Sequence, residues 1–192
     1  AMPRGELLKY YEDVGKVSSL PIILQDTGAS SGQYSADFIE EVCEKVENVG
    51  YVKSEGVNCL PKTKKLVSSF GNKIQVIGGS GGYAMPTLLR LGITAFMTGT
   101  ECTDVHDDVI QAYFKGNELE ADRLYHMTIL SYLYFFAQYS RYFLKYMLKR
   151  RGLLDNVYLP FPNEAGEPDA FVIAELDRTL ERINEIRGKN IL

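Results

Sequence analysis

Short apolar segments alternate with longer amphipathic segments through the first part of the chain. The apolar segments fall at 21–26, 50–55, 73–79 and 93–99. Each has the length of a buried strand and is followed by room for one helix. Because strands that alternate with helices form parallel sheets covered by those helices, the pattern predicts a parallel sheet of four strand-then-helix units.

Residues at the expected helix ends agree with this pattern. Ser35 stands at an N-cap position before an apolar stripe, and Pro61 stands early in the next helical segment. Glycines stand where three helices are expected to end, at Gly71, Gly92 and Gly116. A further amphipathic helix, over 6–17, precedes the first strand.

The second part of the chain has helical spacing only. Asn117 with Glu120 three residues later predicts a helix start, and helical spacing continues to about Arg151. Aromatic residues recur on one face of this stretch, at Tyr125, Tyr132, Phe136, Tyr139, Phe143 and Tyr146. The stripe predicts a core or subunit contact, with a ligand-binding face as the alternative. A last amphipathic helix is expected from Asp169 to about Ile186.

Composition and charge narrow the function classes. With 192 residues, 45% of them hydrophobic, the chain can bury a substantial core. A net charge of −4 and a pI near 5.3 give no basis for a nucleic-acid partner. No apolar stretch approaches the roughly 20 residues of a membrane span, so we expect no membrane partner. The three cysteines are widely spaced, which predicts free thiols in a reducing compartment, hence a cytoplasmic protein, and no metal site.

Lys53 is the strongest candidate for chemistry, because it lies within a segment expected to be a buried strand. An ammonium group removed from water favours its neutral form, and a neutral amine is a nucleophile that condenses with carbonyl groups. Strand alternation places Tyr51, Lys53 and Glu55 on one face. The alternative is a lysine at a strand end that simply forms an ion pair with Glu55.

The ends of the other expected strands supply further candidates, since the active face of a βα barrel is built after the carboxyl ends of its strands. The segment Gly78–Tyr83 is rich in glycine and could bring backbone amides to an anion or a hydroxyl group; a tight turn is the alternative. It matches neither the dinucleotide nor the phosphate-loop motif. Thr98 is polar at the end of the fourth strand, which suits a wet pocket or a plain strand exit.

Taken together, these residues make the chain resemble the dihydrodipicolinate synthase and N-acetylneuraminate lyase family of Schiff-base-forming (β/α)8 barrels. The four expected strands are similar to the family's fifth to eighth strands, and Lys53 stands at the imine-forming lysine of the sixth. The resemblance implies an α/β fold of the TIM-barrel family, of which residues 1–116 form about the last four βα units. Residues 117–192 resemble the family's C-terminal helical region.

Departures from the family pattern point to a substrate class. Gln25 stands where synthases and neuraminate lyases have a proton-shuttling tyrosine, and Asp26 stands where they have asparagine. A carboxamide cannot relay protons at neutral pH. The synthase arginine falls near Ser30, which disfavours a lysine-pathway synthase. The Gln-Asp pair with the Lys-x-Glu motif at Lys53 and Glu55 is similar to dehydratases of 2-oxo-3-deoxy sugar acids such as 2-oxo-3-deoxyarabonate.

The resemblance implies a lyase that needs no cofactor beyond a covalent imine at Lys53 with a small 2-oxo acid. Glu55 is then the candidate base or proton carrier, and Gln25 a hydrogen-bonding positioner. The expected substrate-binding residues are Asp26, Gly79, Ser80, Gly81 and Thr98. A pyruvate-releasing aldolase, or a synthase-like enzyme, is the alternative within the family, and a non-catalytic half-barrel scaffold is the alternative of another class.

The family barrel also has four earlier strands, with a carboxylate-binding loop and a second tyrosine that this sequence lacks. Four parallel strands without closure would leave two bare edges and an open interior. We therefore expect a partner: a missing N-terminal half barrel, in a separate chain or in a longer precursor of which this chain is a fragment, or a second copy in a homo-oligomer.

Overall fold

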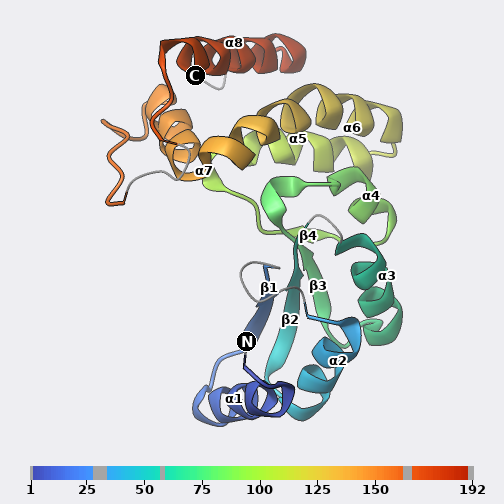
Figure 1. Cartoon of the computed structure of the whole chain (residues 1–192). Helices are drawn as coiled ribbons and strands as arrows, with labels where there is room; N and C mark the ends of the chain where they lie inside the picture. The colour runs from blue at the N-terminus through green and yellow to red at the C-terminus, as the bar shows by residue number, and fades with distance from the viewer. Residues whose placement is uncertain (1, 28–33, 57–58, 162–165, 190–192) are drawn as a thin grey trace. The chain divides into compact units, whose positions relative to one another are not determined.

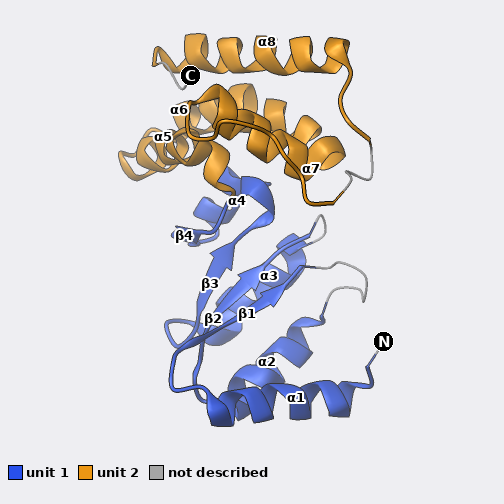
Figure 2. Ribbon diagram, turned by 90° about the vertical axis from the view of Figure 1, so that its left-hand side faces the viewer, with its two compact units in different colours: residues 1–98 blue, residues 99–192 orange. Residues whose placement is uncertain are grey.

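The chain folds into two compact units, residues 1–98 and 99–192 (Figure 2). The computed structural model describes residues 2–27, 34–56, 59–161 and 166–189. The units divide at a point earlier than the region boundary expected after residue 116. The reason is that helix α5 (Thr103–Phe114), which follows the fourth strand, packs mainly on helix α6 (Glu118–Leu124) in the second unit.

The first unit contains a four-stranded parallel sheet in the order β1-β2-β3-β4. The strands are β1 (Ile22–Asp26), β2 (Val49–Ser54), β3 (Gln75–Gly78) and β4 (Ala95–Phe96). The parallel sheet predicted from the sequence is confirmed, although β4 is shorter than expected. The register places Gln25 beside Lys53 and Asp26 beside Ser54, so the ends of β1 and β2 are level.

Helices cover one face of this sheet (Figure 1). The helices of the first unit are α1 (Arg4–Val17), α2 (Ala36–Lys45), α3 (Cys59–Phe70) and α4 (Met85–Arg90). The Ser35 hydroxyl accepts a hydrogen bond from the Phe38 backbone N–H at 3.2 Å, which confirms the predicted cap of α2. Gly71 and Gly92 adopt positive φ directly after α3 and near the end of α4, as expected for helix ends.

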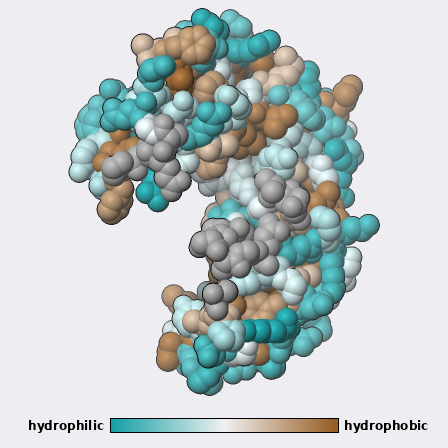
Figure 3. All heavy atoms as spheres, viewed as in Figure 1, coloured by the Kyte–Doolittle hydropathy of each residue, from teal (hydrophilic) through white to brown (hydrophobic). Residues whose placement is uncertain are grey.

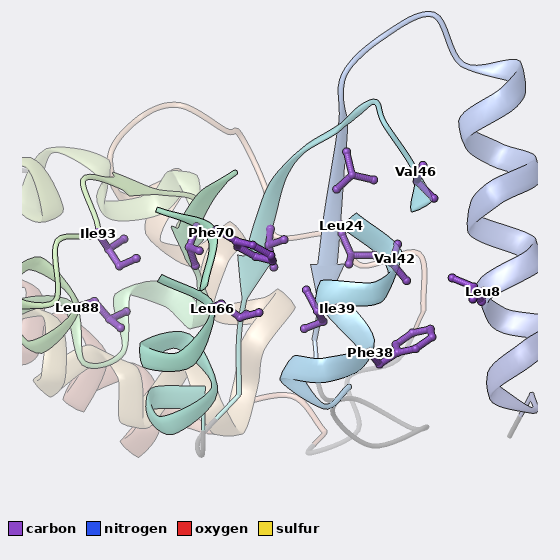
Figure 4. Close-up of a cluster of buried hydrophobic side chains, with 13 residues drawn as sticks. Leu8, Leu24, Phe38, Ile39, Val42, Val46, Leu66, Phe70, Leu88 and Ile93 are labelled. Carbon is purple, nitrogen blue, oxygen red and sulfur yellow. The ribbon is translucent and has the colours of Figure 1, made fainter. Parts of the chain in front are cut away.

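The hydrophobic core of the first unit lies between the sheet and these helices (Figure 4). Leu24 of β1 and Val52 of β2 point into it and meet Ile39 and Val42 of α2 and Leu66 of α3. All five side chains are at most 2% exposed. Burial of this apolar area is the main force that holds α2 and α3 on the sheet.

The other face of β1 and β2 is open. Ile23 and Tyr51, which are neighbours in the register, are 42% and 36% exposed. In a closed barrel this face would be the interior, so its exposure is what a sheet comprising part of a barrel should show. Lys53 and Gln25 follow at alternate positions and therefore lie on this same face.

The second unit is helical. Besides α5 and α6 it contains a π-helical segment (Tyr125–Ile129), α7 (Leu130–Arg150) and α8 (Ala170–Arg187). Asn117 accepts a hydrogen bond from the backbone at the start of α6, as predicted, and Asp169 accepts one at the start of α8. The long predicted helix is interrupted, by the π-helical segment and by a non-helical Ser140 within α7.

The inner part of the aromatic stripe is core. Tyr132 and Phe143 are fully buried and stack with ring centres 5.6 Å apart. The Tyr132 hydroxyl also bonds to the His106 ring at 2.9 Å, and the other ring nitrogen of His106 lies 2.8 Å from the Cys102 carbonyl oxygen. These contacts favour a structural role for this buried histidine.

The surface of each unit mixes hydrophilic and hydrophobic residues on the face seen in Figure 3. Among the described helices, none has both the length and the apolar character needed to cross a membrane.

Candidate active site

The Glu55 carboxylate is the centre of a polar cluster at the carboxyl ends of β1, β2 and β3. Its Oε2 accepts a hydrogen bond from the Gln25 side-chain amide at 2.6 Å. Its Oε1 accepts one from the Ser80 backbone N–H at 2.7 Å and lies 3.5 Å from the Lys53 ammonium. Charged acceptors form the stronger class of hydrogen bond, so the cluster fixes the carboxylate in one orientation.

The glycine-rich segment after β3 is shaped to receive this carboxylate. A Cβ atom on Gly79 would overlap the Glu55 side chain, so only glycine leaves room for it. Ser80 follows with a positive φ of 53°, which is strained for a residue other than glycine. The Ser80 hydroxyl accepts a hydrogen bond from the Gly56 backbone N–H at 3.0 Å, and these bonds tie the segment to the end of β2. Gly81 is buried and also adopts a positive φ.

Lys53 and Glu55 are mostly buried, with side chains 13% and 12% exposed. Glu55 stands two positions along from Lys53, so strand alternation directs both to the open face, as predicted. The pair combines an amine with an adjacent proton acceptor. An arrangement of this kind serves nucleophilic attack on a carbonyl group, since the amine must give up its proton before it can attack.

Asp26 is separated from this cluster although it follows Gln25 directly. It points to the helix-covered face, is 2% exposed, and forms an ion pair with Lys62 of α3. Its Oδ1 also accepts a hydrogen bond from the Tyr34 backbone N–H at 3.2 Å. The structure therefore does not bring Asp26 to Lys53, where a substrate-binding residue was expected.

Thr98 lies farther from Lys53 in the order of the strands than the other expected residues do. Thr98 is half-buried, two residues beyond β4, and β3 lies between that strand and β2. Ser30 lies outside the described residues. The hollow lined by Lys45, Val46 and Asn48, among others, is at the amino-terminal ends of the strands, away from Lys53. Within the described ranges, no group of three or more histidine, cysteine or acidic residues is arranged to hold a metal ion.

Sequence reasoning missed two residues of α3, Lys62 and Thr63. Lys62 pairs with Asp26, and the Thr63 hydroxyl lies 2.8 Å from the Ser54 hydroxyl in a buried contact. Strand alternation could have shown that Asp26 and Ser54 face the helices. The identity of the partners depends on how α3 packs, which no local pattern gives.

Comparison with solved structures relates this architecture to known barrels. Dihydrodipicolinate synthase from Rhodopseudomonas palustris matches with a TM-score of 0.80 at 21% identity, over 94% of this chain and 62% of that chain. The N-acetylneuraminate lyase of Mycoplasma synoviae matches with a TM-score of 0.69 at 18% identity, over 97% of this chain and 60% of that one. The chain has the fold of this barrel family. The resemblance in fold predicted from the sequence is thus confirmed, with the chain forming a partial barrel.

A sequence relative adds a more specific similarity. The chain is 28% identical to the L-2-keto-3-deoxyarabonate dehydratase of Azospirillum brasilense over 123 residues. These aligned residues cover 62% of this chain. No family model matches the chain. It spans 39% of that dehydratase and about three fifths of the solved barrels.

Proposed function

We propose that the whole protein is a lyase that forms a Schiff base between Lys53 and a 2-oxo acid, and that its substrate is a 2-oxo-3-deoxy sugar acid. The observation that carries the proposal is the cluster of Lys53, Glu55 and Gln25 at the carboxyl edge of a parallel sheet. The similarity to a 2-keto-3-deoxyarabonate dehydratase supports the substrate class. No separate cofactor is required, because the imine itself activates the substrate.

The reaction begins when the neutral Lys53 amine adds to the C2 carbonyl and the carbonyl oxygen leaves as water. The protonated imine that results withdraws electrons from C3. Glu55 takes a proton from C3, and the electron pair left behind forms an enamine. The enamine expels the C4 hydroxyl group, which takes a proton from Glu55 and leaves as water. Hydrolysis restores the C2 carbonyl and frees Lys53, so the net change is the loss of one water.

In this proposal Gln25 positions the Glu55 carboxylate through a hydrogen bond and transfers no proton itself. Because a carboxylate only accepts hydrogen bonds, the Gln25 amide nitrogen must face Glu55, and its carbonyl oxygen is then directed elsewhere. A carboxamide does not exchange protons at neutral pH, so Glu55 is left as the proton carrier of the cluster. The glycine-rich segment at Gly79, Ser80 and Gly81 is proposed to contact the substrate, and Thr98 to line the same pocket.

Cleavage between C3 and C4 is the second candidate, favoured by the fold shared with N-acetylneuraminate lyase. The same imine at Lys53 would then release pyruvate, after a base removes the proton of the C4 hydroxyl rather than that of C3. Gln25 argues against this outcome, because it replaces the tyrosine that relays protons in such lyases.

A partner is proposed to close the site. The four-stranded sheet has β1 and β4 as its outer strands, and the face that carries Lys53 is open. We propose that a further half barrel, from the same protein or from a second copy, pairs with these edges, and that the active protein is an oligomer.

Intact mass measured after treatment with pyruvate and borohydride tests the imine. The whole protein should gain one reduced pyruvate adduct, and peptide mapping should locate it at Lys53. The Lys53→Met variant should gain none, while Lys65→Met, which removes an exposed lysine of α3, should react as the parent does. An unmodified parent protein would refute the lyase and favour a scaffold. Incubation with 2-oxo-3-deoxyarabonate should then yield a product lighter by one water, whereas release of pyruvate would establish the aldolase.

A further inference from the structure

Helix α3 contacts the sheet with two consecutive polar residues at the level of the candidate site. Lys62 pairs with Asp26 at the end of β1, and Thr63 bonds to Ser54 at the end of β2. The two strand residues are neighbours in the register. One helix turn therefore holds the ends of both strands that carry the proposed catalytic residues.

Each of these contacts lies directly behind a residue of the cluster. Asp26 follows Gln25, and Ser54 separates Lys53 from Glu55. Because neighbouring strand residues point to opposite faces, a displacement of Asp26 or Ser54 on the helix side displaces the side chains on the open side. The 2.6 Å bond between Gln25 and Glu55 spans the same two strands, so it depends on their remaining level.

A gain in the stability of the fold is a weak explanation for the buried ion pair between Lys62 and Asp26. The Asp26 side chain is 2% exposed and that of Lys62 is 9% exposed, so both charges have lost most of their water. A buried ion pair is often no more stabilising than an apolar pair of similar volume. A hydrogen-bonded ion pair differs from an apolar contact because it requires a particular geometry of its two groups. Such a contact can hold the end of a strand in one position.

We propose that Lys62 and Thr63 form a brace that positions Gln25, Lys53 and Glu55 from behind the sheet. The proposal rests on the proposed function for its catalytic consequence. It assigns Lys62, Thr63, Asp26 and Ser54 as positioning residues that do not touch the substrate. Loss of the brace should disturb the bond between Gln25 and Glu55 before it unfolds the sheet.

The first test is a structural readout on the whole protein. The side-chain amide of Gln25 gives its own nitrogen-proton resonance, which can be assigned with a Gln25→Leu variant. Lys62→Met should shift this resonance, Lys62→Arg should restore most of it, and the matched control Lys65→Met should leave it unchanged. Lys65 is suited to this comparison because it lies on the same helix, where its side chain is 50% exposed in an exposed ion pair with Asp37. An unchanged Gln25 resonance in Lys62→Met would overturn the brace.

The second test measures the rate of pyruvate trapping by borohydride for each folded molecule, across pH. Lys62→Met and Asp26→Asn should slow trapping by roughly tenfold to a hundredfold and change its pH profile, because small displacements of reacting groups cost rates of this order. The double variant should be no slower than either single one. Trapping as fast as the parent would contradict the positioning role.

Two safeguards keep the tests decisive. If Lys62→Met does not fold, Thr63→Val removes one buried hydroxyl group with little change in volume and is judged by the same two readouts, with Thr63→Ser as the rescue. If the parent protein traps no pyruvate, the proposed function fails, and the Gln25 resonance alone still decides whether the brace exists.

Discussion

Each unit has a glutamate side chain packed closely against a glycine, and the two glutamates differ in their hydrogen bonds and in their exposure. A Cβ atom on Gly79 would overlap Glu55, and one on Gly99 would overlap Glu101. Glu55 has two hydrogen-bond donors and an ammonium group around it, and 12% of its side chain is exposed. Glu101 is completely buried, and neither of its carboxylate oxygens has a hydrogen-bond partner in the described part of the chain.

The difference teaches that burial alone does not make a carboxylate useful for chemistry. Burial raises the pKa of Glu101, and the positive charge of the nearby Arg151 guanidinium opposes the rise only in part. A buried carboxyl group without partners favours its neutral form. Glu55 instead lies beside two hydrogen-bond donors and the Lys53 ammonium, at the edge of the sheet where the candidate site is. The proton-transfer role proposed for Glu55 therefore has a geometric basis that Glu101 lacks.

The largest expected effect comes from removing the charge of Glu55. Glu55→Gln should slow dehydration of the sugar acid by about a hundredfold to ten-thousandfold, the usual contribution of a general acid or base. Imine formation with pyruvate at Lys53 should slow much less than dehydration, because it needs no proton to be taken from C3. Borohydride trapping therefore separates the two steps. The matched control is Glu101→Gln, which should dehydrate the substrate at the parental rate. Normal turnover by Glu55→Gln would remove the contrast between the two glutamates.

A second variant moves Glu55 without changing its chemistry. Gly79→Ala places a methyl group where the carboxylate lies, so Glu55 must leave its donors. We expect a loss of roughly a hundredfold in the rate of dehydration, since a displacement of about 1 Å can have that effect. Kinetics with the sugar acid measure it, and Gly50→Ala is a suitable control, because a Cβ atom on Gly50 would meet nothing within 4 Å. Equal loss in both variants would point to general damage to the sheet.

The smallest effect concerns stability and tests Glu101. The folded state binds a proton at Glu101 more tightly than the unfolded state does, because its pKa is raised above the ordinary 4.5. The free energy of unfolding therefore falls as pH rises from that value through the raised pKa. Glu101→Met should raise the free energy of unfolding at about pH 8 by about 1–3 kcal/mol, the usual cost of an unsatisfied buried group.

Urea unfolding of the parent and Glu101→Met at about pH 4 and about pH 8 checks this prediction. The gain should shrink towards the lower pH, where the carboxyl group is mostly protonated in both states. A gain of the same size at both pH values would mean that the ionisation of Glu101 does not limit stability.

Patterns within a few residues predicted much of the fold. The caps at Ser35 and Asn117 are confirmed. They could be predicted because an N-cap side chain bonds to a backbone N–H only three residues away. The shared face of Lys53 and Glu55 follows from strand alternation alone. The long helical stretch was predicted without its interruption at Ser140, since nothing in the helical spacing marks a break there.

The candidate site was predicted only in part. Lys53, Glu55 and Gln25 were chosen from the sequence, and they lie together. The resemblance of the Gln25-Asp26 pair to sugar-acid dehydratases predicted Asp26 as a substrate-binding residue, but it faces the helices and pairs with Lys62. Its partner is 36 residues away, and the register and packing of α3 decide that contact.

The sequence by itself determined the strand-then-helix order, the helix ends and the face on which Lys53 lies, because each follows from spacings of two to four residues along one segment. The tertiary structure decided which charges meet. It placed the Glu55 carboxylate against Gly79 and paired Asp26 with Lys62 on the helix-covered face of the sheet. It left the two carboxylate oxygens of Glu101 without a hydrogen-bond partner among the described residues. These outcomes depend on how separate elements pack, and the energy of a charged group is set by the water it loses and the partners it gains there.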